Sequence, residues 1–308
     1  MPRVSAIVVN WNGAADLAVA LPSLLAQTYP NLEVIVVDNG SHDESENVAR
    51  QFGIGWVSLG RNFGLARAMN AGARAASGHE LLFLNNDMRF APDFVARLVE
   101  ALEGWPEAFA ADAKQFSWDG SVVVHCRTVL RAGQHSGWLG PFQVAQAEVD
   151  EIVPCVFGSA ANLLVRRDRF EALGGWDPSY PIGWEDVDLC LRAWARGWPT
   201  IYVPSAVCWH RVGASAETGP GARARLEGTV LGSLRFAMVH LDGSSALRLA
   251  VRVVAGTMRD LALRPRSGWA RTRALVRLIG DTGRLWRRRR ELTTLSSPRE
   301  RIAELPSL

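Results

Sequence analysis

One stretch of sequence decides the fold of this chain, Glu80-Leu81-Leu82-Phe83-Leu84-Asn85-Asn86-Asp87-Met88. The run from Leu81 to Asn85 is typical of a strand that is buried on both faces. Two amides and a carboxylate follow, so Asp87 is expected at the carboxyl end of a core strand. Ligands bind at that edge of open α/β sheets, and a fixed carboxylate there suits a hard divalent cation shared with phosphate oxygens. A polar turn that merely ends the strand is the alternative interpretation.

Three further strand patterns precede this stretch and alternate with helix patterns. Strands are expected over residues 4–10, 33–37 and 55–59, with helices from 14 to about 27, over 44–52, and from 65 to about 76. This alternation at short spacing predicts a mainly parallel sheet with helices on both faces. Right-handed crossovers bring the strand ends to one edge, so we expect Asn10, Asp38 and Asp87 to converge.

The pattern is less regular after Asp87. A helix is expected from Pro92 to about Glu103 and a strand over 108–116, whereas residues 119–153 show no clear pattern. Apolar, glycine-bearing sequence returns at 157–167 and is followed by a short helix.

The next helix is expected to run from about 185 to 196. Three acidic residues, Glu185, Asp186 and Asp188, lie in its first turn, where the helix dipole favours negative charge. Acidic residues often cap helices, and Asp188 is spaced to pair with Arg192, so a structural role for this cluster stays open.

A strand over 200–203 leads to His210, which we expect in a loop. A single histidine is usually structural or solvent-facing. A neutral imidazole can bind a metal, however, and the neighbouring Arg211 can contact phosphate.

Composition excludes several classes of protein. Lys114 is the only lysine and does not stand in a Gly-Lys-Ser/Thr sequence, which excludes P-loop NTPases and protein kinases. The turn at Asn10–Ala15 has one glycine where a dinucleotide-binding fold needs three. No apolar run reaches transmembrane length, and we expect no signal peptide. Four cysteines without CxxC spacing predict reduced thiols in a cytosolic protein.

The carboxyl-terminal part has a different character. Residues 213–222 resemble a linker, and arginine-rich helices are expected over 223–241, 245–263 and 268–292. Residues 241–308 hold fifteen arginines against six acidic residues, a net charge of +9, so residues 1–240 carry −6. We therefore expect two parts, residues 1–215 and an arginine-rich helical extension over 216–308.

The second of these helices has one apolar face, formed by Leu247, Val251, Val254, Met258 and Leu261. It could lie on an anionic membrane surface, or it could pack against the rest of the protein. The run 287–290 of four arginines could also suggest nucleic acid, but no known binding module accompanies it, so no nucleic-acid partner is expected.

Several segments together resemble the family 2 glycosyltransferases of the GT-A fold, especially their bacterial rhamnosyltransferase-like branch. They occur in the family's order across roughly residues 4–215. They are Val8–Asn12, Val37–Asp43, Asn62–Gly64 with Asn70 and Gly72, Leu84–Asp87, Gly158 with Leu164–Arg167, Gly174–Asp177, Glu185–Arg192 and His210.

The resemblance implies an α/β GT-A fold and transfer of a sugar from a nucleoside diphosphate, usually with inversion and with Mg²⁺ or Mn²⁺. It makes Asp87 a metal ligand, with His210 near the metal or the diphosphate. It makes the acid of the Glu185-Asp186 pair the catalytic base, with Asp186 preferred. The predicted donor contacts are Asn10, Asp38, Asn39, Ser41, Asn62, Gly64, Asn70, Asn85, Asn86 and Arg211.

The chemistry of these residues agrees with that reading. A metal stabilises the departing diphosphate, and inverting transfer needs one carboxylate to take the proton of the acceptor hydroxyl. Because Asn85-Asn86-Asp87 holds one carboxylate where the DxD motif has two, metal and nucleotide are expected to bind together.

The expected function is synthesis of a bacterial surface polysaccharide or glycolipid at the cytoplasmic face of the membrane. A UDP- or dTDP-linked donor and a glycan or lipid-linked acceptor are expected. The alternatives are a nucleotidyltransferase of similar fold, and a non-catalytic scaffold that binds a membrane or a partner.

Overall fold

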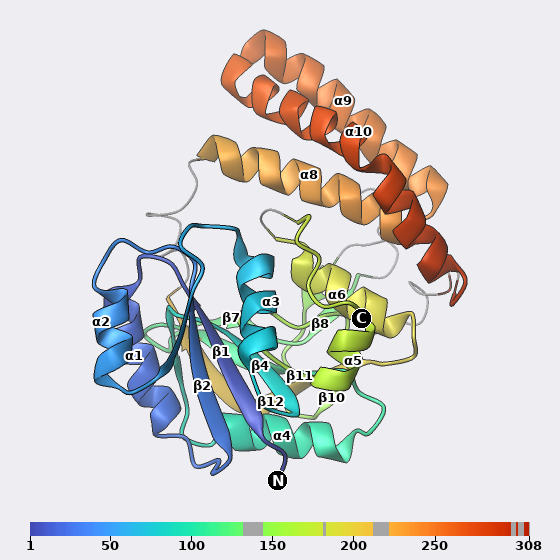
Figure 1. The fold of residues 1–308 in the computed structure, drawn as a ribbon. Helices are drawn as coiled ribbons and strands as arrows, with labels where there is room; N and C mark the ends of the chain where they lie inside the picture. Colours follow the sequence, from blue (N-terminus) through green and yellow to red (C-terminus); the bar gives the residue numbers. More distant parts are fainter. Residues whose placement is uncertain (132–143, 181–182, 212–221, 297–299, 301–304, 308) are drawn as a thin grey trace.

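A computed structural model describes residues 1–131, 144–180, 183–211, 222–296, 300 and 305–307. One ten-stranded sheet organises the first two thirds of the chain (Figure 1). Its parallel half has the order β4-β1-β2-β3. These strands are β1 (Val4–Asn10), β2 (Leu32–Asp38), β3 (Gly55–Ser58) and β4 (Glu80–Asn85). The four strands predicted before Asp87 are confirmed.

The other half of the sheet is mixed. β11 (Asn162–Arg166) runs antiparallel between β4 and β6 (Ala110–Ser117), and β12 (Thr200–His210) is parallel to β6. Three short strands pair antiparallel at this side: β5 (Met88–Phe90), β7 (Val123–His125) and β10 (Val153–Cys155). β8 (Thr128–Leu130) and β9 (Val144–Gln146) form a separate pair.

Helices cover both faces of the sheet, as predicted. α1 (Ala14–Leu25) and α4 (Phe94–Gly104) bury apolar side chains against one face, and α2 (Ser45–Gln51) packs beside α1. α3 (Leu65–Ala75), α5 (Arg167–Ala172) and α6 (Glu185–Trp194) cover the other. This is a GT-A-type α/β architecture. All four cysteines are buried free thiols.

The expected loop position of His210 was wrong. His210 is the last residue of β12, which extends the strand predicted over 200–203 by seven residues. Pro204 interrupts the apolar pattern, and the strand accommodates the interruption with a shift of register between Val203 and Val207.

The described part of the carboxyl-terminal extension holds three helices close to the predicted ranges. They are α8 (Ala222–His240), α9 (Gly243–Leu263) and α10 (Pro265–Thr293). Figure 1 shows α8 lying across the ends of α3 and α6, with α9 and α10 on its far side. The predicted linker 213–222 lies outside the described residues, except for Ala222, which begins α8.

The interpretation that the apolar face of α9 packs against the rest of the protein was wrong. Leu247, Val251, Val254 and Met258 are between 46% and 65% exposed. The buried face of α9 instead carries Leu249 and Val253, together with polar residues. Within the described part of the chain, no helix has the length and apolar character to cross a membrane.

Candidate active site

Polar residues meet where the parallel strands end. Asn10 and Asp38 are register partners at the ends of β1 and β2, and Asn85 ends β4 beside Val9. Nδ2 of Asn86 donates to Oδ1 of Asn10 at 2.7 Å, and Nδ2 of Asn10 lies 3.5 Å from Oδ1 of Asp38. The ends of the three strands therefore converge, with Asn86 rather than Asp87 making the contact from the end of β4.

Gly13 allows this convergence. A Cβ atom at position 13 would lie 1.9 Å from Nδ2 of Asn86 and 2.8 Å from Oδ1 of Asn10. Any side chain would therefore displace the Asn86–Asn10 pair. The need for glycine here follows from the close approach of two loops, which the sequence pattern did not show.

Asp38 organises the loop that follows β2. Its carboxylate accepts hydrogen bonds from the backbone N–H and the hydroxyl of Ser41. Oγ of Ser41 in turn accepts from Nδ2 of Asn10 at 3.1 Å and from the backbone N–H of Asn12 at 2.8 Å. Asp38 and Ser41 thus lie together, within reach of one ligand.

A second loop joins this surface through two amide side chains. Nδ2 of Asn39 donates to Oδ1 of Asn62 at 3.1 Å, and that oxygen also accepts from the backbone N–H of Gly64 at 2.9 Å. Oδ1 of Asn39 accepts from the backbone N–H of Phe63 at 2.8 Å. The structure brings Asn39, Asn62 and Gly64 together beside Asp38.

Asn70 has a different place. Its Oδ1 accepts from the backbone N–H of Trp176 at 3.0 Å, and its Nδ2 donates to the Trp176 carbonyl at 2.8 Å. Both ends of the amide fasten α3 to the Gly174–Asp177 segment. Asn70 therefore has a structural role, and the predicted donor contact would have to compete with these two bonds.

Asp87 and His210, the two residues predicted to bind a metal, lie side by side. Nε2 of His210 lies 3.2 Å from Oδ1 of Asp87, and Nδ1 of His210 lies 3.1 Å from Oε1 of Gln115. Pairing of β5 with β12 creates this approach, because Met88 and His210 are register partners. Gln115 sets the orientation of the ring and was not predicted.

These two residues fit a divalent cation that is also bound by the phosphate groups of a sugar donor. The carboxylate suits Mg²⁺ or Mn²⁺, whereas the imidazole suits a transition-metal ion and so favours Mn²⁺ over Mg²⁺. Among the residues that the structure describes, no three histidine, cysteine or acidic side chains gather as a metal cluster. The remaining ligands would have to come from phosphate oxygens and water, as expected from the single acid in Asn85-Asn86-Asp87.

Arg211 lies at the same edge but is already engaged. Its guanidinium is 3.0 Å from Oδ1 of Asp16 and lies over the ring of Trp118. Its backbone N–H donates to the carbonyl of Asp87 at 2.9 Å. A phosphate contact would therefore compete with Asp16 for the guanidinium.

Glu185 and Asp186 begin α6 behind an unusual cap. Trp184 precedes them with a φ of 74°, a left-handed conformation that is rare for a bulky residue. Burial raises the pKa of Asp186, although backbone N–H groups of Val187 and Ala160 oppose the shift. Burial and the Asp186 carboxyl raise the pKa of Glu185 to about 8.

The two acids are therefore unequal. Oε2 of Glu185 finds no hydrogen-bond partner among the described residues, whereas Oδ1 of Asp186 accepts from the Val187 N–H at 2.8 Å. The carboxylate of Asp186 is stabilised by the N–H groups of Val187 and Ala160 and by His125, whereas the Asp186 carboxyl opposes ionisation of Glu185. This difference agrees with the choice of Asp186 as the predicted base.

His125 and Asp112 stand near this pair and were not predicted. Nε2 of His125 lies 2.8 Å from Oδ2 of Asp112, whose Oδ1 accepts from the Ser159 N–H at 3.0 Å. Burial lowers the pKa of His125, but Asp112 and Asp186 outweigh it, so that pKa is raised. The missed signal is Asp112, a fully buried acid inside the predicted strand 108–116.

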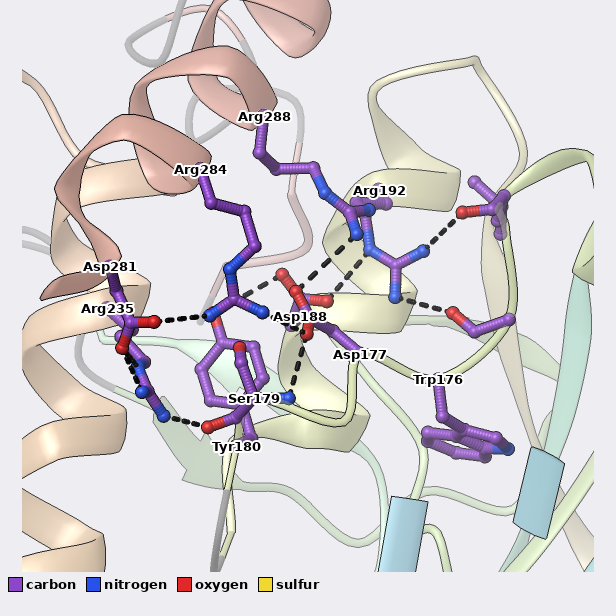
Figure 2. Close-up of polar contacts among 12 residues, drawn as sticks. Trp176, Asp177, Ser179, Tyr180, Asp188, Arg192, Arg235, Asp281, Arg284 and Arg288 are labelled. Carbon is purple, nitrogen blue, oxygen red and sulfur yellow. Dashed lines mark hydrogen bonds and ion pairs between the residues drawn. The ribbon is translucent and has the colours of Figure 1, made fainter. Parts of the chain in front are cut away.

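Asp188 has a structural role, and Figure 2 shows it with two of its partners, Arg192 and Tyr180. Its carboxylate lies 2.8 Å from Nε of Arg192 and 2.9 Å from Nε2 of His240. The Tyr180 hydroxyl donates to it at 3.3 Å. The predicted Asp188–Arg192 pair is confirmed, and α8 contributes a further partner through His240.

Comparisons with known proteins indicate one protein family. The profile of the family described as Glycosyl transferase family 2 matches residues 5–173. An N-acetylglucosaminyl-diphospho-decaprenol L-rhamnosyltransferase of Mycobacterium tuberculosis is 29% identical over 241 residues, covering 70% of this chain and 78% of that protein. The O-antigen biosynthesis protein RfbC of Myxococcus xanthus is 32% identical over 70% of this chain but only 18% of its own length.

Solved structures agree on the fold. A mannosyltransferase from Pyrobaculum calidifontis, solved with GDP-Man and Mn²⁺, is 20% identical with a TM-score of 0.58 and covers 91% of this chain and 88% of its own. GalNAc-T7, solved with UDP, GalNAc and Mn²⁺, is 18% identical with a TM-score of 0.62 and covers 79% of this chain and 49% of its own.

Proposed function

We propose a function for this chain from the family to which it belongs, glycosyl transferase family 2, and from its rhamnosyltransferase-like character. In this proposal it transfers a sugar, with inversion, from a nucleoside diphosphate to a lipid-linked acceptor. The observation that carries the proposal is the position of two acids with different surroundings. Asp87 lies beside an imidazole at the strand edge, whereas Asp186 lies in a carboxyl pair of raised pKa. The two can divide charge neutralisation and proton transfer between them.

The donor would lie across the carboxyl ends of β1, β2 and β4. Asp38 and Ser41 would contact the base and ribose, with Asn39, Asn62 and Gly64 supporting them from the second loop. Asn10, Asn85 and Asn86 line the edge toward Asp87. We propose a UDP- or dTDP-linked sugar.

Asp87 and His210 would hold Mn²⁺ or Mg²⁺, which would offset the negative charge that develops on the leaving diphosphate. Asp186 would accept the proton of the acceptor hydroxyl as its oxygen bonds to the anomeric carbon. The bond from that carbon to the diphosphate breaks at the same time, with inversion. Protonated Glu185 beside Asp186 would leave a single negative charge in the pair.

The acceptor is proposed from chemistry and from one relative. That relative is named for a sugar linked through a diphosphate to decaprenol. An acceptor with a long lipid requires access to a membrane, and the exposed apolar face of α9 offers it. Arg248, Arg252 and Arg259 lie on the same helix and would face anionic headgroups at the inner surface of the cell membrane.

A donor panel tests the proposal. Purified full-length protein is incubated with UDP-, dTDP- and GDP-linked sugars, a prenyl-diphosphate-linked N-acetylglucosamine and Mn²⁺ or Mg²⁺, and both nucleoside diphosphate and glycosylated lipid are measured. We expect acceptor-dependent release with one donor class, and only with metal. Equal release without acceptor, or transfer that persists in EDTA, would contradict the proposal.

A further inference from the structure

A cavity of about 400 Å³ lies between the sheet domain and the carboxyl-terminal helices. One wall is the start of α3 with the residues before it, from Phe63 to Arg67, and a second is the segment Pro178–Tyr180. α8 contributes Arg235, and the last wall is one face of α10 from Arg277 to Arg284. Figure 2 shows Arg235, Asp281 and Arg284 gathered beside Ser179 and Tyr180.

The cavity is strongly basic. Four arginines line it, at positions 67, 235, 277 and 284, against one acidic residue, Asp281. Arg235 is buried, and it donates to both Asp281 and the Ser179 carbonyl. A buried arginine at this position is fixed in place before any ligand arrives.

The acids nearby do not balance these charges, because each is shared by two arginines. Asp281 binds Arg235 and Arg284, and Glu227 binds Arg273 at 2.9 Å and Arg277 at 3.1 Å. Asp177 lies 3.6 Å from Arg284 and 3.4 Å from Arg288. Among the residues that line the cavity itself, four arginines therefore face one carboxylate, an excess of three positive charges.

The start of α3 adds backbone donors to the same cavity. Gly64 occupies the N-cap position, no side chain caps the helix, and its first turn holds no acidic residue. The first N–H groups of a helix have no partner within the helix and favour an anion. Gly64 and Ala66 line the cavity, so these donors complement the guanidinium groups.

We propose that this cavity binds the phosphate groups of the acceptor, as a phosphate or diphosphate linked to a lipid. The assignment rests on the proposed function and extends it to a second anion site, apart from Asp87 and His210, which do not line the cavity. Guanidinium groups bind phosphate oxygens through paired hydrogen bonds, and an excess of three charges suits a diphosphate better than a single carboxylate.

The position of the cavity favours a lipid-linked group. Gly64 stands both at the cavity and in the proposed donor surface, so the two anions would lie on either side of one loop. On α10, the exposed apolar residues Val276 and Ile279 flank Arg277 in sequence. A lipid that leaves the cavity along α10 would pass these side chains.

Binding of inorganic diphosphate to the full-length protein tests the site directly. Titration calorimetry is run in EDTA, so that no metal-bridged binding at Asp87 contributes. Arg67→Gln and Arg277→Gln should each weaken diphosphate binding at least about tenfold, the usual loss for a charged hydrogen bond.

The two variants share a matched control. Arg74→Gln removes an exposed arginine of α3 that does not line the cavity. This control should bind diphosphate like the wild type. Absence of diphosphate binding in the wild type, or equal binding by Arg67→Gln and Arg74→Gln, would overturn the assignment.

Competition identifies the source of the phosphate. A short-chain prenyl diphosphate should displace inorganic diphosphate from the wild type, and Arg277→Gln should raise the KM for the lipid-linked acceptor with the KM for the donor unchanged. Failure of displacement would overturn the assignment to the acceptor in favour of a free anion. If diphosphate binding responds to the variants but no lipid-linked acceptor is glycosylated, the proposed function fails while the anion site stands.

Discussion

Nε2 of His240 lies 2.9 Å from Oδ1 of Asp188, and both residues are buried. His240 ends α8 and Asp188 lies in the first turn of α6, so the carboxyl-terminal extension touches the helix that carries Asp186. Phe236 of α8 reinforces this contact, because its ring stacks on His240 and lies 4.9 Å from the ring of Trp184. The extension therefore helps to position the proposed base.

Asp188→Asn should lower the free energy of unfolding by about 3–5 kcal/mol, because it leaves the Arg192 guanidinium buried without its counter-charge. Urea denaturation measures this change. Asp186→Asn is the control, since Asp186 has no ion pair in the described part of the chain, and it should unfold close to the wild-type midpoint. Equal midpoints for the two variants would refute the structural role of Asp188.

The same carboxylate should make stability depend on acid pH. Burial favours its neutral form, but Arg192 and His240 hold the pKa of Asp188 well below its usual range. A lowered pKa in the folded state gives stability that is full above the unfolded pKa of 3.8 and is lost as the pH falls. The difference in unfolding free energy between the wild type and Asp188→Asn should therefore shrink below about pH 4.

Asp186→Asn should reduce kcat by about 10²–10⁴-fold, the usual contribution of a positioned general base. Donor binding, measured by calorimetry with metal present, should stay near the wild-type value because Asp87 and His210 are unchanged. Asp87→Ala should show the opposite pattern, with metal-dependent donor binding lost. Transfer that survives both substitutions would exclude the proposed mechanism.

His125→Gln should move the rising limb of the pH–rate profile toward higher pH. The positive charge of His125 lowers the pKa of Asp186, which burial otherwise raises. Without that charge Asp186 would lose its proton at a higher pH, so activity would appear later as the pH rises. Thermal unfolding checks that the variant is folded, and an unmoved limb would place His125 outside the electrostatics of the base.

Val251→Glu combined with Met258→Glu should abolish recovery of the protein with anionic liposomes. Both side chains are exposed on α9, and a carboxylate there opposes both burial in lipid and attraction to anionic headgroups. The melting temperature should not change, since neither residue packs in the core. Val122→Glu is the control, an equally exposed apolar residue of the sheet domain. Liposome recovery that is lost equally in the control would argue against a specific surface.

The sequence predicted the parallel half of the sheet well, because its strands are short apolar runs that end in polar residues. It did not predict the place of β11 in the sheet. Residues Asn162–Arg166 have the pattern of any buried strand, and that pattern does not show which strands are the neighbours. The direction of a strand between two neighbours depends on the path of the chain and not on local pattern. β5 has only three residues, which are too few to give a recognisable strand pattern between Asp87 and the next helix.

The residues of the candidate site were predicted where they follow the end of a strand pattern. They were not predicted where only the packing of distant segments brings them together. Asp38, Asp87 and Asn10 were found from their positions after β-strand patterns. His125 was missed because its strand lies in an irregular region, and only folding brings it to Asp112. On α9 the periodicity of Leu247 and Val251 identified an apolar face correctly, but periodicity does not say whether such a face meets protein or solvent.

One apolar cluster contains Val187 and Leu191 of α6 together with Leu231 of α8, Leu249 of α9 and Ala274 of α10. The carboxyl-terminal extension therefore shares an apolar cluster with α6 and could not be removed without exposing that cluster. A chimaera that grafts the tail of a relative onto this sheet domain should fold only if α6 and the Asp177–Tyr180 segment are exchanged with it. If the carboxyl-terminal extension determines which acceptor is used, this preference would be exchanged together with α6, the helix that carries the proposed base. Acceptor preference and the proposed base would therefore move together in any recombination between relatives.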